Sequence, residues 1–171
     1  MSQFAPDGQG KGCRVPEAPW RRARSLVFVL LIAATTAAAE PPAVEHLDSG
    51  KVLPAGLPFS EAVRTGDLLH LSGQIGIRPG TRELVPGGLE AESRQTLENI
   101  RTTLEAHGLS LRDVVKCTIM LADMTQWGRF NAIYREFFAP PYPARSAFGT
   151  NGLALGAQVE VECLARVPPR F

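Results

Sequence analysis

Apolar side chains recur at helical spacing in two segments of the chain. Over residues 89–107 they repeat every three to four positions, and Gly108 follows as a left-handed stop. A second segment begins after Asp123, which together with Gln126 resembles a capping box, and ends at Pro140. Its aromatic stripe consists of Trp127, Phe130, Tyr134 and Phe137. We therefore expect two helices whose apolar stripes pack into the core.

Other segments carry the patterns of strands. Residues 68–72 predict a short strand, and the extended pieces of residues 75–85 predict a hairpin across Pro79-Gly80. Residues 114–121 have apolar side chains in both alternating sets, which favours a central strand buried on both faces. Residues 159–165 alternate apolar and polar positions. The order of elements predicts an α+β domain with two helices on one face of a mixed sheet.

The first 39 residues differ in kind from the rest of the chain. Three arginines between residues 21 and 24 precede the apolar run 26–32, and Ala37-Ala38-Ala39 follows. These are the parts of a secretory signal peptide, and the apolar run is shorter than the ~20 residues of a membrane span. We expect cleavage after Ala39, a periplasmic or secreted protein and no stable membrane association. The alternative is a retained single-pass anchor.

Removal of this leader would leave 132 residues, the size of one domain. Residues 40–57 are rich in Pro, Gly and polar residues and predict an irregular lead-in to an ordered domain over residues 58–171. The leader holds five of the 18 basic and two of the 17 acidic residues, which leaves 13 basic and 15 acidic residues, a net charge of −2. This balance gives no support for nucleic-acid binding through a basic face.

The cysteines and histidines indicate no metal site. Cys117 and Cys163 each lie in an apolar run typical of a strand, where we expect buried free thiols, with a disulfide as the alternative. His46, His70 and His107 are scattered, and no Cys/His cluster has metal-ligand spacing. We therefore expect no metal ion.

Arg145 is the leading candidate for a ligand-binding residue. It lies at the start of a predicted strand, and a planar guanidinium binds both oxygens of a carboxylate. Glu160 and Glu162 share one face of a later strand, with Cα atoms roughly 6.5 to 7 Å apart. Such a pair raises each other's pKa unless a cation such as Arg145 lies between them, and one of the two could serve as a base for water. The alternative is that both glutamates are solvated or interface residues on an outer face and that Arg145 is a surface residue.

Several different short motifs occur, each once, along residues 54–167. They are Leu71-Ser72-Gly73-Gln74-Ile75, Arg94-Gln95, Leu97-Glu98-Asn99, Asp113-Val114-Val115-Lys116-Cys117-Thr118, Asn131 followed by Tyr134, Phe137 and Phe138, Pro143-Ala144-Arg145-Ser146, and Val159-Glu160-Val161-Glu162. Together they resemble the RidA (YjgF-type) family of reactive intermediate deaminases. The resemblance implies a chorismate-mutase-like fold that forms a homotrimer, with ligand sites in the clefts between subunits. It also implies cofactor-free hydrolysis of 2-aminoacrylate and related enamine or imine intermediates to 2-keto acids and ammonia.

The resemblance also implies roles for individual residues. Arg145 would hold the substrate carboxylate, and Glu160 would position or activate the attacking water. Ser72, through its hydroxyl, and Gly73 would line the same pocket, and Asn131 would reach it from the second helix.

Two pocket positions depart from the family pattern. Phe59 stands where these deaminases commonly carry Tyr, and Ala147 stands where they commonly carry Cys. Both changes would make the pocket less polar. Together with the leader, they motivate an alternative function, a non-enzymatic trimeric protein that binds a small carboxylate in the periplasm. The negative charge of the mature chain argues against the ribonuclease activity attributed to some relatives.

Overall fold

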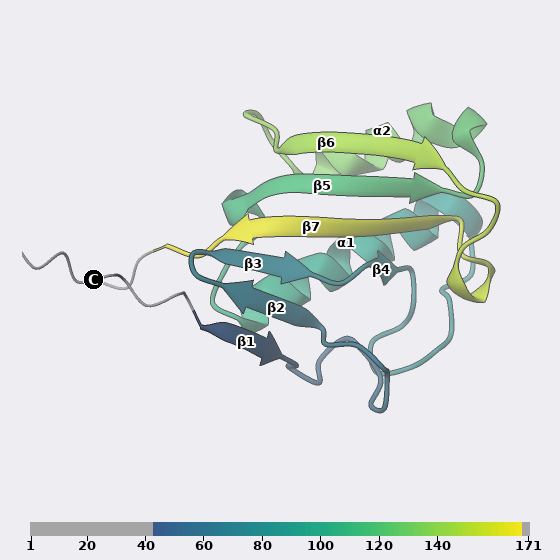
Figure 1. Cartoon of the computed structure of the whole chain (residues 1–171). Helices are drawn as coiled ribbons and strands as arrows, with labels where there is room; N and C mark the ends of the chain where they lie inside the picture. Colours follow the sequence, from purple (N-terminus) through teal and green to yellow (C-terminus); the bar gives the residue numbers. More distant parts are fainter. Residues whose placement is uncertain (1–42, 169–171) are drawn as a thin grey trace, which may run out of the picture. The chain divides into compact units, whose positions relative to one another are not determined.

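One mixed sheet forms the frame of this computed structural model, which describes residues 43–168 (Figure 1). The signal peptide expected over residues 1–39 lies outside the described residues. The strands lie in the order β1-β2-β3-β7-β5-β6, and the short β4 pairs with β7. Paired strands are antiparallel except for β5 and β6, which are parallel. The strands are β1 Val44–Leu47, β2 Ala62–Thr65, β3 Leu68–Leu71, β4 Gln74–Ile75, β5 Val114–Leu121, β6 Ala144–Gly149 and β7 Val159–Arg166.

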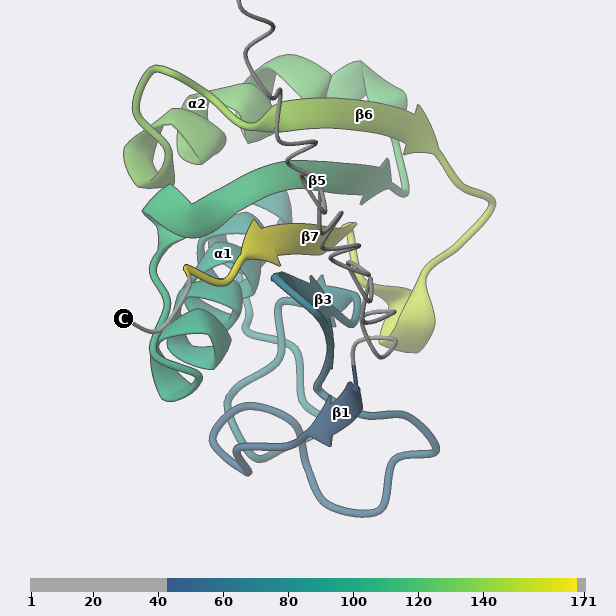
Figure 2. The same ribbon diagram turned by 60° about the vertical axis from the view of Figure 1, so that its left-hand side comes forward.

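Two helices cover the same face of this sheet, as expected from the sequence. α1 (Gly88–Ala106) lies behind the middle strands, and α2 (Trp127–Phe137) lies behind β6 (Figure 1). The turned view of Figure 2 places both on one side of the sheet. The main core contains Leu97, Ile100 and Leu104 of α1 and Phe130, Ile133 and Tyr134 of α2. Neither helix in the described part of the chain has the length and apolar content to cross a membrane.

Local signals explain where the helices begin and end. Gly108 has a φ of 75°, and the N–H of Leu109 donates to the Leu104 carbonyl at 2.9 Å, which closes the end of α1. A 3₁₀ turn, Met124–Gln126, precedes α2, and the Asp123 side chain accepts from the N–H of Thr125 at 2.9 Å. α2 connects the parallel strands β5 and β6, and the rings of Trp127 and Tyr134 on this helix lie against the guanidinium of Arg145 near the start of β6.

The opposite face of the sheet is open in a single chain. Along β7, Val159, Val161 and Cys163 are buried toward the helices, whereas Glu160 is half-buried and Glu162 exposed on the other side. On β5, one alternating set is buried and the other remains partly or fully exposed. The expected burial of residues 114–121 on both faces is therefore wrong for one chain alone.

Cys117 and Cys163 form a disulfide, so the expectation of free thiols is wrong. The two residues lie directly opposite each other on β5 and β7, with Cα atoms 4.1 Å apart. Facing side chains at this distance are within bonding reach. The pairing depends on the register of strands 46 residues apart in sequence, which local patterns do not reveal.

The N-terminal part is more ordered than its composition suggests. β1 lies within residues 40–57, for which an irregular lead-in was the expectation, and pairs with β2, which the pattern does not predict. The buried carboxylate of Glu61 fastens this region, because it accepts from the N–H of Ser49 at 2.8 Å and from the Thr103 hydroxyl at 3.2 Å. The predicted hairpin is present as a bridge between Ile77 and Leu84.

Candidate functional site

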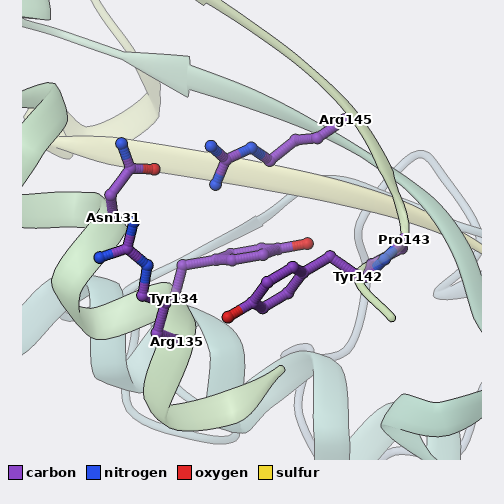
Figure 3. Close-up of a pocket in the computed structure, with 6 residues that line it drawn as sticks. All are labelled: Asn131, Tyr134, Arg135, Tyr142, Pro143 and Arg145. Carbon is purple, nitrogen blue, oxygen red and sulfur yellow. The ribbon is translucent and has the colours of Figure 1, made fainter. Parts of the chain in front are cut away.

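Arg145 points into a cavity of about 210 Å³ between α2 and the start of β6 (Figure 3). Its guanidinium carbon lies 4.5 Å from the Trp127 ring centroid and 4.7 Å from that of Tyr134. Figure 3 shows the guanidinium end turned toward the Asn131 amide. Two aromatic faces hold the cation in place by cation–π attraction, and no described carboxylate forms an ion pair with it.

Two polar atoms in the same place lack partners. Asn131 Oδ1 and the Tyr134 hydroxyl are buried and make no hydrogen bond to a described residue. Burial raises the pKa of Tyr134 to about 12, so the hydroxyl stays neutral and can donate. Buried polar groups without partners are costly. Cation, donor and acceptor together suit a small carboxylate that also carries an N–H group.

Glu160 lies beside a second, larger cavity of about 430 Å³, which Phe59 and Gly73 also line. A Cβ atom on Gly73 would overlap Glu160 Oε1, so the glycine allows the carboxylate to lie against the backbone. The pairing of Ile75 in β4 with Glu160 in β7 fixes this neighbourhood.

Burial and the negative charge of Glu162 raise the pKa of the Glu160 carboxyl above its usual value. A raised pKa makes the carboxylate a better proton acceptor. Glu162 lies two residues further along β7 and is exposed. The sequence-based expectation that the two glutamates affect each other is thus confirmed for Glu160.

Two expected pocket residues lie apart from both cavities. The Ser72 hydroxyl donates to the Ser60 carbonyl at 2.7 Å, and its backbone N–H donates to the Glu61 carbonyl at 3.0 Å. The hydroxyl is therefore already engaged, although Ser72 directly precedes Gly73. Ala147 shares a face of β6 with Arg145 but packs, partly buried, against the main core.

Arg145 and Glu160 lie on opposite faces of the sheet. Arg145 pairs with Cys117 and Glu160 pairs with Met120, and these two partners are three positions apart on β5. Alternating side chains three positions apart point to opposite faces. The interpretation that Arg145 lies between Glu160 and Glu162 is therefore wrong within one chain.

The described chain thus carries two half-sites. The arginine half-site comprises Arg145, Asn131 and Tyr134 on the helix-covered face. The glutamate half-site comprises Glu160, Gly73 and Phe59 beside the larger cavity. Each groups residues from distant segments that the sequence motifs had associated.

Sequence reasoning missed the second role of two aromatic residues. Trp127 and Tyr134 keep helical period and were expected in the core; they do pack against it, and they also hold the Arg145 guanidinium. Their periodicity carried no sign of this contact, which depends on where β6 joins the sheet. Within residues 43–168, no group of three His, Cys, Asp or Glu side chains could hold a metal ion.

Comparisons with known proteins show the family of the chain. The protein family described as Endoribonuclease L-PSP matches residues 50–167. The 2-iminobutanoate/2-iminopropanoate deaminase of Mus musculus is 41% identical over 108 residues, which cover 63% of this chain and 80% of that protein. The solved structure of YEO7 from yeast has a TM-score of 0.70 at 33% identity and covers 74% of this chain and 100% of its own.

A structure with a bound amino acid is also similar. Escherichia coli TdcF, crystallised with bound serine, has a TM-score of 0.67 at 29% identity and covers 72% of this chain and 99% of its own. With the family match over residues 50–167, the chain belongs to the Endoribonuclease L-PSP family, the RidA (YjgF-type) family that its motifs resemble.

Proposed function

We propose that this protein hydrolyses small 2-imino acids to 2-keto acids and ammonia. The observation that carries the proposal is the arginine half-site, in which a cation without an ionic partner adjoins unpartnered Asn131 and Tyr134 oxygen atoms. Relatives named 2-iminobutanoate/2-iminopropanoate deaminase, at 41% and 39% identity, support the same reaction.

Arg145 and Glu160 have different roles in the proposed reaction. Arg145 binds the substrate carboxylate through its guanidinium fork. Glu160 accepts a proton from a water molecule, whose oxygen forms a bond to the imine carbon. The π electron pair of the carbon–nitrogen double bond moves to the nitrogen, which takes up that proton and gives a tetrahedral carbinolamine. The proton of the new hydroxyl group then passes to the same nitrogen, the remaining carbon–nitrogen bond breaks, and ammonia leaves as the carbonyl forms. No oxidation or reduction occurs, and the chemistry requires no cofactor.

The two half-sites can act on one substrate only if they come from different copies of the chain. Within one chain, the sheet separates Arg145 from Glu160. We therefore propose a homotrimer in which the arginine half-site of one subunit meets the glutamate half-site of the next. The open face of the sheet, which a single chain leaves uncovered, supports such an assembly.

Export to the periplasm is part of the proposal. The leader pattern over residues 1–39 motivates it, and the Cys117–Cys163 disulfide supports it, because disulfides persist mainly in oxidising compartments. N-terminal sequencing of protein from the periplasmic fraction is expected to begin at Glu40. Recovery of full-length protein in the cytoplasm alone would contradict it.

A second candidate function is the capture of a small carboxylate without turnover. It is favoured by the arginine half-site, which has its cation, donor and acceptor in place independently of Glu160. The two functions differ in one observable, the rate at which an imino acid disappears.

A coupled assay decides between them. An amino-acid oxidase generates imino acids from several amino acids, and their decay is followed with and without the purified protein. We expect acceleration that Arg145→Ala abolishes while the assembly remains intact. Decay at the rate of free solution, with a folded assembly, would replace the deaminase by the carboxylate-binding protein.

A further inference from the structure

The cavity beside Glu160 is mainly apolar. Its apolar walls include Leu57, Phe59, Ile75, Ile77 and Leu155, and two charged residues, Arg82 and Glu160, also line it. At about 430 Å³, it is twice the size of the cavity at Arg145. A methyl or ethyl group would leave most of this space empty, whereas a branched or aromatic group would fill much more of it.

Hydrogen bonds and apolar packing hold two wall residues of the cavity, Ile75 and Ile77, in place. Asn99 of α1 donates from Nδ2 to the carbonyls of Ile75 and Ile77, at 3.1 and 3.0 Å. Ile77 also belongs to a second apolar cluster with Val52 and Leu53, against which Leu57 and Ile75 pack. A wall held in this way keeps its shape in the absence of a ligand, which is the property of a preformed binding pocket.

Two large apolar side chains remain exposed at the cavity. Phe59 is 49% exposed and Leu155 is 58% exposed. Leu155 also has a φ of 57°, and among the described residues it is the one non-glycine with a positive φ. A left-handed leucine is strained, and such strain is retained where it positions a side chain for function. The backbone N–H of Gln158, which donates to Glu92 at 2.7 Å, anchors the end of this turn.

We propose that this cavity receives the side chain of the substrate, so that the enzyme prefers 2-imino acids with branched or aromatic side chains. The inference rests on the proposed deaminase function. In a 2-imino acid, the carboxylate, the nitrogen and the side chain are all bonded to the carbon that the water attacks. When the carboxylate lies on Arg145 and the water on Glu160, the apolar cavity beside Glu160 is the space left for the side chain.

The test compares imino acids made by an oxidase from alanine, leucine and phenylalanine. We expect kcat/KM to be at least about 10-fold higher for the leucine or phenylalanine product than for the alanine product, since apolar pockets discriminate on this scale. Leu155→Asn, which tolerates the left-handed backbone but is polar, is expected to reduce that ratio several-fold. Val44→Asn alters an exposed apolar residue away from the cavity and is expected to keep the ratio.

A further variant protects the test against misfolding. Leu155→Gly relieves the backbone strain and removes the side chain, and it is expected to melt no lower than wild type while lowering the same ratio. Two results would contradict the side-chain pocket but not the deaminase function. One is deamination of all three products with the alanine product preferred. The other is a kcat/KM ratio that changes in neither Leu155 variant. Absence of acceleration for every product overturns both.

Discussion

At the scale of single residues, Arg145 shows how aromatic rings can hold a partly buried cation without an anion. Trp127 and Tyr134 offer it two ring faces, at 4.5 and 4.7 Å, which hold its position but satisfy none of its five N–H donors. A carboxylate that arrives there meets a preorganised donor array in a partly dehydrated cavity, where charge-assisted hydrogen bonds are stronger.

Replacement of Arg145 tests this binding role. Arg145→Ala is expected to lower kcat/KM about 10- to 100-fold or more, the value of a hydrogen-bonded charge. Arg145→Lys is expected to recover only part, because an ammonium lacks the planar fork. Arg129, an exposed arginine on α2 that pairs with Glu90, gives the control Arg129→Ala, which is expected to match wild type. Equal loss in both alanine variants would contradict the assignment.

Gly73 permits the close approach of Glu160 to the backbone. In Gly73→Ala, the new methyl group would displace the flexible carboxylate end, so kcat is expected to fall while stability changes little. Gly76→Ala is the comparison variant. Its methyl group would lie 2.6 Å from the Glu92 backbone, so we expect it to lower the free energy of unfolding by about 1–3 kcal/mol. Kinetics and urea unfolding of both variants check this division, and full activity in Gly73→Ala would refute it.

The pH dependence of the reaction is expected to reflect the charge on Glu160. A base must be deprotonated, so activity is expected to fall as the pH drops through its pKa, which burial and the charge of Glu162 raise above the usual value of a glutamate. Glu162→Gln removes a repelling charge, and we expect the acidic limb of the kcat/KM profile to move to lower pH. Glu162→Asp keeps the charge and is expected to leave the limb in place. If the acidic limb lies at the same pH in wild type and in Glu162→Gln, Glu160 is not the base.

At the scale of elements, local signals are enough for the helices and the central strands. The period of residues 89–107, the stop at Gly108 and the alternation of residues 159–165 each predict their element, and the structure confirms them. β1 and β2 escape prediction because they are four residues long and partly polar. Their stability comes from pairing and from the buried Glu61, which are long-range effects.

Strand register is the information that the sequence lacks. It joins Cys117 to Cys163 and places Arg145 and Glu160 on opposite faces, and neither follows from the pattern of one segment. The motifs placed Arg145, Asn131, Gly73 and Glu160 in one pocket. In one chain, Arg145 and Asn131 line one cavity, and Gly73 and Glu160 line another.

The disulfide between β5 and β7 is expected to stabilise the sheet. It closes a loop between residues 46 apart, and removal of such a crosslink typically costs about 2–4 kcal/mol. The double variant Cys117→Ala, Cys163→Ala is expected to unfold at lower urea concentration than wild type. Reductant should lower the midpoint of wild type and leave that of the variant where it is. If reductant leaves the urea midpoint of wild type unchanged, the disulfide does not contribute to stability.

At the scale of the whole molecule, the proposed mechanism makes assembly a condition of catalysis, because its two half-sites lie apart within one chain. Each chain carries one copy of each half-site on opposite faces of its sheet, so a closed ring would create one complete site for each neighbouring pair. The net charge of −2 over residues 40–171 does not favour the binding of a polyanion such as RNA. Hydrolysis of an imino acid therefore fits the site better than cleavage of RNA.

Complementation between two inactive variants tests this arrangement most directly. Arg145→Ala and Glu160→Gln are purified separately, then unfolded, mixed in equal amounts and refolded together, with each variant refolded alone as the control. If neighbouring copies share each site, about a quarter of the sites in random mixtures combine an intact Arg145 with an intact Glu160. We predict that the mixture regains about that fraction of wild-type activity. A mixture as inactive as its components, although wild type refolds to full activity, would contradict a site built from two copies.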